Sequence, residues 1–313
     1  MAFAMVFPGQ GSQSLGMLAA LSEQEPLVRE TFAEASAVLG YDLWQLCQQG
    51  PVDLLGSTEK TQPAMLTAGV ATWRVWRKHG GGLPAAMAGH SLGEYTALVC
   101  AGAIDFRVAV DLVRFRGQMM QSAVPPGQGA MAAILGLEDA DVEAVCADAA
   151  QGEIVQAANF NSPGQVVIAG QKTAVERAIE LLKAKGAKRA LILPVSVPSH
   201  TELMRPAAEQ LAERLKSIAF KTPETAVYTV GMRTHSGNED IRKALYKQLV
   251  GPVRWTDTIK TILGTGIKVI VECGPGKVLT GLNRRIERNK DLTMLSVEDP
   301  ASLSEALNAV KVS

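Results

Sequence analysis

Short apolar runs alternate with longer amphipathic stretches along most of this chain. The runs have the length and composition of buried strands, and glycine, proline or small polar residues bound them. We predict strands at residues 2–7, 83–88, 226–230 and 267–273. Between them the apolar positions recur with a helical period. We predict helices at residues 26–39, 61–76, 94–101, 106–122, 201–218, 241–249, 256–263 and 277–288. Strands that alternate with helices indicate an α/β fold with a doubly wound parallel sheet.

The order of elements changes after Pro125, Pro126 and Gly127, which interrupt the helical pattern. The pattern there predicts strands at residues 130–137, 154–159, 165–169 and 188–195 and helices at residues 139–150 and 173–185. The resulting order, β-α-β-β-α-β, is that of a ferredoxin-like unit. We therefore expect a large α/β domain formed by residues 1–125 and 196–313, with a ferredoxin-like subdomain inserted at residues 126–195.

A candidate nucleophile lies between the second predicted strand and the helix that follows it. Residues 89–93, Gly-His-Ser-Leu-Gly, match the pattern G-x-S-x-G. In that pattern a sharp turn projects the serine hydroxyl above the edge of the sheet. The two glycines avoid a clash between strand and helix and tolerate unusual backbone angles. Ser91 is thus a candidate nucleophile, and the alternative is a serine that only caps a helix.

Composition narrows the function classes. The 31 basic and 31 acidic residues of the 313 balance, which argues against a general nucleic-acid-binding surface. Four cysteines are widely spaced without a C-x-x-C pair, so we expect buried free thiols in a reducing compartment and no zinc site. No apolar run approaches the roughly 18 residues of a membrane span, and the N-terminus lacks a basic signal-peptide start. We expect a soluble, cytoplasmic protein.

A glycine-rich loop follows the first predicted strand at residues 8–13. Glycines there expose backbone N–H groups, which suits an anion or a developing oxyanion. The loop lacks the G-K-[ST] ending of a phosphate-binding loop. An ordinary strand-to-helix turn is the alternative interpretation.

A serine nucleophile needs a base, and the chain has four histidines. His90 is adjacent to Ser91, and adjacent side chains at a sharp turn point apart. His79 falls at a predicted helix end, where a cation satisfies the last carbonyl groups, and His235 falls in a polar segment. Elimination leaves His200 as the best candidate, with a structural role as the alternative.

Four segments together resemble the successive signatures of the malonyl-CoA:acyl carrier protein transacylases of bacterial fatty-acid synthesis. They are residues 7–13 (FPGQGSQ), 89–95 (GHSLGEY), 197–200 (VPSH) and 272–276 (ECGPG). The segments occur in the family's order and span nearly the whole chain. The family's fold, a hydrolase-like α/β domain with a ferredoxin-like insert, agrees with the predicted organisation. The segment 228–238 departs from the family pattern and leaves one wall of the cleft undefined.

The resemblance implies a role for each matching residue. Ser91 would attack the malonyl thioester, and His200 would act as general base and then as general acid. A backbone carbonyl in the region of Gln248 would orient the histidine in place of an aspartate. The backbone N–H groups of Gln10 and Leu92 would form the oxyanion hole.

The resemblance also implies the substrate site. Arg116 matches the arginine that grips the free malonyl carboxylate, and a planar guanidinium can pair both carboxylate oxygens. Gln248 is assigned to the same substrate-binding site. Without the resemblance, Arg116 would be taken for part of a solvated helix face.

The predicted activity is transfer of malonyl from malonyl-CoA to acyl carrier protein through a malonyl-serine intermediate. Both half-reactions exchange a thioester with an ester, so no metal or redox cofactor is expected. The expected partners are malonyl-CoA and acyl carrier protein, with no nucleic acid and no membrane.

Two alternatives come from other classes. A serine hydrolase with an ordinary triad would draw its acid from Asp141 or Asp148, which precede His200 in the required order. Residues 79–82, His-Gly-Gly-Gly, also spell the oxyanion motif of lipases, but they precede the strand that leads to Ser91 and should lie at its opposite end. A carrier-protein-binding module with an inert Ser91 is the non-enzymatic alternative.

Overall fold

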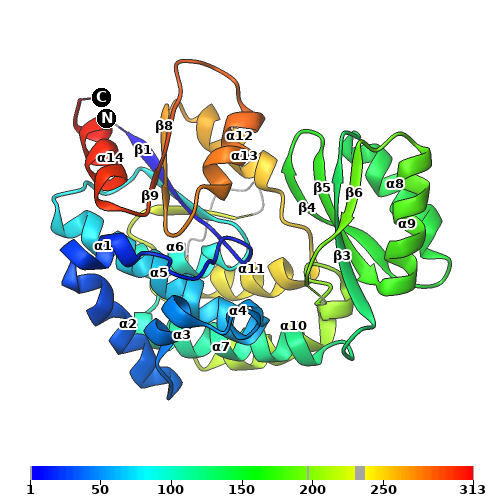
Figure 1. Ribbon diagram of the computed structural model, residues 1–313, viewed down its shortest axis with the longest axis horizontal. Coiled ribbons are helices and arrows are strands. Elements are labelled where there is room, and N and C mark those ends of the chain that lie inside the picture. The colour runs from blue at the N-terminus through cyan, green and yellow to red at the C-terminus, as the bar shows by residue number, and fades with distance from the viewer. Residues whose placement is uncertain (1, 196, 230–236, 313) are drawn as a thin grey trace. The chain divides into compact units, whose positions relative to one another are not determined.

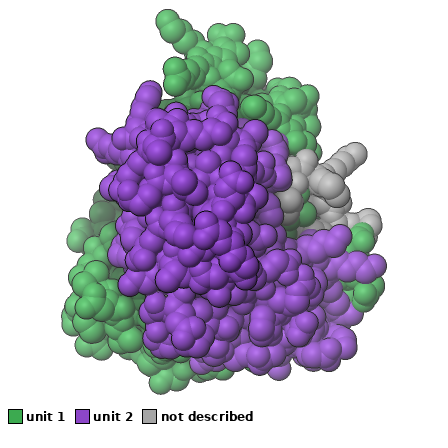
Figure 2. All heavy atoms as spheres, turned by 90° about the vertical axis from the view of Figure 1, so that its right-hand side faces the viewer, with its two compact units in different colours: residues 1–117, 218–241, 258–313 green, residues 118–217, 242–257 purple. Residues whose placement is uncertain are grey.

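The computed structural model describes residues 2–195, 197–229 and 237–312. The chain divides into two compact units, which Figure 2 distinguishes by colour. Unit 1 comprises residues 1–117, 218–241 and 258–313, and unit 2 comprises residues 118–217 and 242–257. The two units are defined only by contacts between residues, and they do not test where domains begin and end. The domain limits expected at 125/126 and 195/196 therefore stay a prediction.

Unit 1 is built on a five-stranded sheet (Figure 1). Its strands are β1 (Phe3–Phe7), β2 (Ala86–Gly89), β7 (Ala226–Tyr228), β8 (Val269–Cys273) and β9 (Thr293–Val297). They lie in the order β7-β2-β1-β8-β9, and every pairing is parallel. Every residue of β1 and β8 is buried, as expected for central strands of a parallel sheet covered on both faces. The parallel sheet is therefore confirmed, and β9 extends it beyond the strands that the sequence predicted.

The helices of unit 1 include long elements and several short ones. They are α1 (Ala19–Gln24), α2 (Pro26–Leu39), α3 (Leu43–Gln49), α4 (Val52–Gly56), α5 (Thr58–Lys78), α6 (Gly93–Cys100), α13 (Val278–Ile286) and α14 (Pro300–Val312). Two further helices, α7 (Phe106–Ser122) and α12 (Trp255–Gly264), have residues in both units.

The predicted start of α5 was wrong. The helix begins at Thr58 and not at Thr61, and Ser57 occupies the N-cap position. Pro63 lies inside the helix and not in its first turn. The Thr61 hydroxyl donates a hydrogen bond to the Leu55 carbonyl at 2.5 Å, so it does not cap the helix. Proline is favoured in the first turn of a helix, where its missing N–H would have no helical acceptor. Pro63 therefore suggested a start that lies about one turn too late.

Unit 2 contains the predicted β-α-β-β-α-β unit. Its elements are β3 (Gly129–Leu135), α8 (Asp139–Ala150), β4 (Val155–Ser162), β5 (Gln165–Gln171), α9 (Lys172–Ala184) and β6 (Arg189–Ile192). The sheet order is β4-β5-β3-β6 with antiparallel pairs (Figure 1). The helices α8 and α9 share one apolar core with the strands, which includes Ile134, Val142, Phe160, Ile168 and Ile179. The ferredoxin-like element order is confirmed.

Unit 2 also holds the segments that follow this sheet. The predicted helix at 201–218 is divided into a short 3₁₀ turn, η1 (Glu202–Met204), and α10 (Arg205–Lys216). Most of α11 (Asn238–Val250) belongs to unit 2 as well. The end of the predicted strand 226–230, most of the segment 228–238, and His235 lie outside the described residues.

Candidate active site

Ser91 lies on the sharp turn between β2 and α6. Its φ is +51°, in the left-handed region that a residue with a side chain seldom adopts. Leu92, and not Ser91, occupies the N-cap position of α6, so the helix-cap interpretation of Ser91 was wrong. A strained residue at such a turn points to a functional constraint, because the strain persists only where the surrounding structure enforces it.

The two glycines of the motif permit a close approach of strand and helix. A Cβ added at Gly89 would lie 1.8 Å from the carbonyl carbon of Gly93. A Cβ added at Gly93 would lie 2.0 Å from the carbonyl oxygen of Phe7. Space, and not a left-handed backbone angle, therefore requires glycine at both positions.

The loop after β1 packs against the Ser91 turn. Strands β1 and β2 are parallel neighbours, and Phe7 lies opposite Gly89. The His90 N–H donates to the Phe7 carbonyl at 3.0 Å, and a Cβ on Gly9 would lie 2.4 Å from the His90 carbonyl oxygen. Gln10 and Leu92 follow these strands on the two loops that touch at the carboxyl edge of the sheet. Backbone N–H groups at such an edge are suited to an anion.

Arg116 on α7 is held beside Ser91 within unit 1. Its side chain is almost fully buried, with 1% of its surface exposed. Nη2 donates to the Ser91 Oγ at 3.4 Å, and Nη1 donates to the Gln62 Oε1 at 2.9 Å. The guanidinium carbon lies 5.3 Å from the centroid of the Tyr95 ring. Sequence reasoning alone would have taken this arginine for a solvated face, and its burial contradicts that interpretation.

Electrostatics at Arg116 follow from this burial. Burial lowers the pKa of the guanidinium, and the nearby Tyr95 and Glu94 oppose that shift. Burial also raises the pKa of Tyr95 to about 12, so its hydroxyl is neutral near pH 7. Three of the side chains that contact Arg116, those of Gln62, Ser91 and Tyr95, are uncharged near pH 7.

Gln62 was missed as a site residue, because residues 61–63 were interpreted only as a helix start. Its side chain is 1% exposed. A signal was present in the sequence, since a long amide side chain stands in a run of α5 that is otherwise buried and mostly apolar. Buried amides require hydrogen-bond partners, so such a residue marks a polar contact inside the fold.

His200 lies in unit 2, and its surroundings there are also constrained. Its φ is +63°, and its side chain is 4% exposed. Nδ1 lies 2.7 Å from the main-chain carbonyl oxygen of Gln248 on α11. A carbonyl only accepts hydrogen bonds, so Nδ1 carries the proton. In the neutral ring Nε2 then holds the lone pair and can act as a base.

The contact between His200 Nδ1 and the Gln248 carbonyl bears on whether His200 belongs to a Ser-His-Asp triad. The acid of a Ser-His-Asp triad binds Nδ1 of the histidine, and here a carbonyl occupies that position. Asp141, one candidate acid, lies in the first turn of α8 and pairs with Lys185 at 2.9 Å. These contacts favour a histidine oriented by the main chain.

His79 differs from its predicted role. It is the C-cap residue of α5, but its Nε2 lies 2.5 Å from Glu25 Oε1. The residue pairs with a carboxylate and not with the last carbonyl groups of the helix.

The described residues also bear on metal binding and on membrane insertion. Within residues 2–195, 197–229 and 237–312, no three or more His, Cys, Asp or Glu side chains gather to hold a metal ion. No helix in the same residues has the length and apolar character to cross a bilayer. All four cysteines are buried and free: Cys47, Cys100, Cys146 and Cys273.

Comparisons with known proteins bear on the whole chain. The family profile of the acyl transferase domain matches residues 4–296. The malonyl CoA-acyl carrier protein transacylase of Escherichia coli O157:H7 is 57% identical over 306 residues, covering 97% of this chain and 98% of the relative. The chain belongs to the malonyl CoA-acyl carrier protein transacylase family.

Solved structures agree with this family. The malonyl CoA-acyl carrier protein transacylase of Coxiella burnetii has a TM-score of 0.96 and 52% identity, covering 98% of this chain and 97% of that one. A malonyl-transacylase in complex with a type II PKS acyl-carrier protein has a TM-score of 0.96 and 56% identity, covering 99% and 100%. The chain is therefore an acyltransferase with the transacylase fold, as the four sequence signatures predicted.

Proposed function

We propose that this protein transfers the malonyl group from malonyl-CoA to the phosphopantetheine thiol of acyl carrier protein, supplying malonyl groups for fatty-acid synthesis. The observation that carries the proposal is the buried Arg116 guanidinium 3.4 Å from the hydroxyl of Ser91. A fixed cation beside a strained serine suits an acyl group with a carboxylate at its far end. The relative that is solved with an acyl-carrier protein supports the choice of acceptor.

The proposed reaction has two half-reactions. Ser91 Oγ attacks the thioester carbon while His200 Nε2 takes the hydroxyl proton. The C–S bond breaks, and the coenzyme A thiolate takes that proton from His200 and leaves as the thiol. The phosphopantetheine thiol then attacks the malonyl ester, with His200 again taking and returning one proton, and Ser91 is regenerated.

The remaining site residues have supporting roles in this proposal. The N–H groups of Gln10 and Leu92 stabilise the tetrahedral oxyanion, and Arg116 pairs with the malonyl carboxylate in the substrate site. The Gln248 carbonyl holds the tautomer of His200, and Gln248 is also assigned to the substrate-binding site. Each half-reaction exchanges a thioester with an ester, so the proposal requires no metal or redox cofactor. The four buried free thiols fit a reducing, cytoplasmic compartment.

Mass spectrometry after incubation with malonyl-CoA tests the proposal. A stable malonyl adduct on Ser91 is expected, and none on Ser91→Ala. Rapid release of free malonate without an adduct would indicate a serine hydrolase, and no change at all would indicate a carrier-binding module.

The proposed base has its own test. His200→Ala should slow acylation by about 10²–10⁴-fold, the usual contribution of a general base. Wild-type acylation should decline as pH falls and the ring of His200 takes a second proton. His90→Ala is the matched control, and a reversed result for the two histidines would show that the wrong base was chosen.

A further inference from the structure

The backbone of the proposed base, His200, needs contacts that hold it in place. Its φ of +63° lies in the left-handed region, which a residue with a side chain adopts only at an energetic cost. In this conformation Nδ1 of the ring reaches the Gln248 carbonyl at 2.7 Å. A backbone that relaxed to an ordinary φ would carry the ring away from that carbonyl. The contacts that hold this backbone therefore decide where Nε2 points.

Thr201, the residue directly after His200, makes such a contact. Its hydroxyl donates to the Pro198 carbonyl at 2.7 Å. This hydrogen bond joins residues on the two sides of His200 and closes the chain into a turn around it. Thr201 has none of its surface exposed, and Pro198 is buried as well. Because water does not reach this carbonyl freely, the loss of its donor would be costly.

The direction of this hydroxyl differs from the usual role of a threonine at a helix start. Thr201 is the N-cap residue of η1, where a threonine oxygen normally accepts an N–H of the following turn, but its side chain makes no such bond. Gln156 on β4 supplies an acceptor to that turn instead, since its Oε1 accepts the Glu202 N–H at 2.9 Å. The Thr201 hydroxyl is thereby available to the preceding turn, which contains His200.

The carbonyl that the ring binds is held through the same strand. Two main-chain hydrogen bonds join β4 to Val253, just beyond the end of α11. The Phe160 N–H donates to the Val253 carbonyl at 2.8 Å, and the Val253 N–H donates to the Ala158 carbonyl at 2.9 Å. Strand β4 thus supports both the acceptor side of the pair and the turn after the histidine.

We propose that Thr201 is a positioning residue for general-base catalysis. Its hydroxyl holds the left-handed backbone of His200, so that Nδ1 stays on the Gln248 carbonyl and Nε2 stays available as the base. The inference rests on the proposed function, because it takes His200 as the base of the acyl transfer. Thr201 acts through His200 and has no contact of its own with the acyl group in this proposal.

Two substitutions of Thr201 test the hydroxyl. Thr201→Val keeps the shape of the side chain but removes the donor, and kcat for acylation of Ser91 should fall about 5–30-fold, the usual effect of an unmade buried hydrogen bond. KM for malonyl-CoA should stay within about twofold of wild type, since substrate binding is untouched. Acetyl-CoA should lose kcat by the same factor, because one base serves every thioester. Thr201→Ser keeps the hydroxyl and should stay within about threefold of wild type.

Proton NMR of the imidazole gives a second readout that does not depend on activity. The Nδ1–H proton of His200, held against a carbonyl, should give a downfield signal that disappears in His200→Ala. In Thr201→Val this signal should move upfield or broaden by exchange with water, and in Thr201→Ser it should remain. The matched control is Thr72→Val on α5, where an equally buried hydroxyl donates to the Ala68 carbonyl at 2.9 Å. It should leave both kcat and the signal unchanged.

The outcomes distinguish this inference from the proposed function. If His200→Ala acylates at the wild-type rate, the proposed base is wrong. If His200→Ala is slow but Thr201→Val keeps wild-type kcat and the NMR signal, only the inference about Thr201 is wrong. In the His200→Ala background Thr201→Val should cause no further loss. A kcat that falls only as far as the folded fraction does, measured by circular dichroism, or an equal loss in Thr201→Ser, would assign Thr201 to stability and overturn the inference.

Discussion

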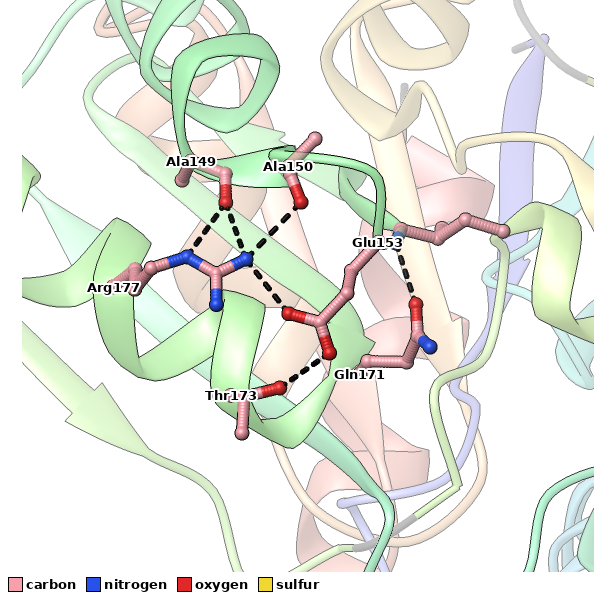
Figure 3. A network of polar contacts seen from close by, with 7 residues as sticks. Ala149, Ala150, Glu153, Gln171, Thr173 and Arg177 are labelled. Atoms are coloured by element: carbon pink, nitrogen blue, oxygen red, sulfur yellow. Dashed lines mark hydrogen bonds and ion pairs between the residues drawn. The ribbon is translucent and has the colours of Figure 1, made fainter.

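Two arginines, one in each compact unit, are held in opposite ways. Arg116 in unit 1 is 1% exposed and contacts the uncharged side chains of Gln62 and Ser91. Arg177 on α9 in unit 2 has a side chain that is 32% exposed and pairs with the carboxylate of Glu153 at 2.7 Å (Figure 3).

The donors of Arg177 also serve the end of a helix. Nε and Nη2 donate to the Ala149 carbonyl at 3.0 and 2.8 Å, and Nη2 reaches the Ala150 carbonyl at 3.1 Å. These carbonyl groups end α8, where helical acceptors have no helical donor. A basic side chain at this position satisfies them and suits the negative end of the helix dipole.

The difference between the two sites lies in the charge of the partners. The charge of Arg177 is met by Glu153 and by carbonyl groups of its own unit, so the residue stabilises the fold. Arg116 donates instead to an amide and a hydroxyl, and the proposed function assigns the malonyl carboxylate to the same guanidinium. Burial makes such pairing stronger, since charges interact more strongly away from water.

Among the changes that test this comparison, Arg116→Ala should have the largest effect, and it acts on malonyl transfer. The value of kcat/KM for malonyl-CoA should fall by about 10²–10³-fold, because a buried carboxylate loses its partner. The value for acetyl-CoA should fall little or rise, since the pocket enlarges and no carboxylate needs pairing. Steady-state kinetics with both thioesters provide the check. An equal loss for both would place Arg116 in the fold or in coenzyme binding, and the contrast with Arg177 would disappear.

Arg116→Lys should have a smaller effect on the same reaction. An ammonium keeps the charge but lacks the planar, two-pronged geometry of a guanidinium. We expect about a tenfold loss with malonyl-CoA, intermediate between wild type and Arg116→Ala. Wild-type kcat/KM for malonyl-CoA in Arg116→Lys would show that the positive charge alone, without the planar geometry, is sufficient for malonyl transfer.

Arg177→Met should affect stability and leave catalysis unchanged. The carbonyl groups at the end of α8 lose their donors but remain partly accessible to water, so we expect a loss of about 1 kcal/mol in the free energy of unfolding. Urea denaturation measures that loss, and malonyl transfer at a temperature well below the transition should match wild type. A selective loss of malonyl transfer would contradict the structural role of Arg177.

The smallest expected effect concerns Glu153 and pH. Hydrogen bonds from Thr173 and Arg177 hold the pKa of the Glu153 carboxyl below its ordinary value of 4.5. A lowered pKa in the folded state means that the carboxylate stabilises the fold above pH 4.5 and that this contribution is lost as pH falls further. The difference in melting temperature between wild type and Glu153→Gln should therefore shrink as pH decreases below about 4.5. A difference that stays constant down to pH 3 would show that the ion pair contributes nothing.

Local sequence patterns were sufficient to predict many helices and strands of the fold. The helices at residues 26–39, 106–122 and 139–150 were predicted with their observed bounds. Gly40, which ends the first of them, has a left-handed φ of +77°, the conformation for which glycine is favoured at a helix end. The parallel sheet and the ferredoxin-like unit followed from the order of such elements.

Elements with a weak local signal were missed. The edge strand β9 has only five residues with mixed burial. Helix α14 was overlooked although it carries a start signal, since Pro300 is its first residue and the Asp299 carboxylate accepts a hydrogen bond from the Ser302 N–H at 2.8 Å. The short helices α1, α3 and α4 were not predicted either, because packing against neighbours stabilises helices of this length more than their own propensity does.

The sequence by itself determined the fold class, the strand–turn–helix at Ser91 and the family, because these depend on residues that are close together in the chain or on motifs that match directly. Only the tertiary structure decided the surroundings of the candidate site. Gln62 and Arg116 are 54 positions apart, and His200 and Gln248 are 48 positions apart. Contacts at such separation depend on how helices and strands pack, and no local periodicity encodes which buried polar groups will meet. The left-handed backbone of Ser91 and of His200 has the same origin, since packing holds a conformation that neither residue prefers on its own.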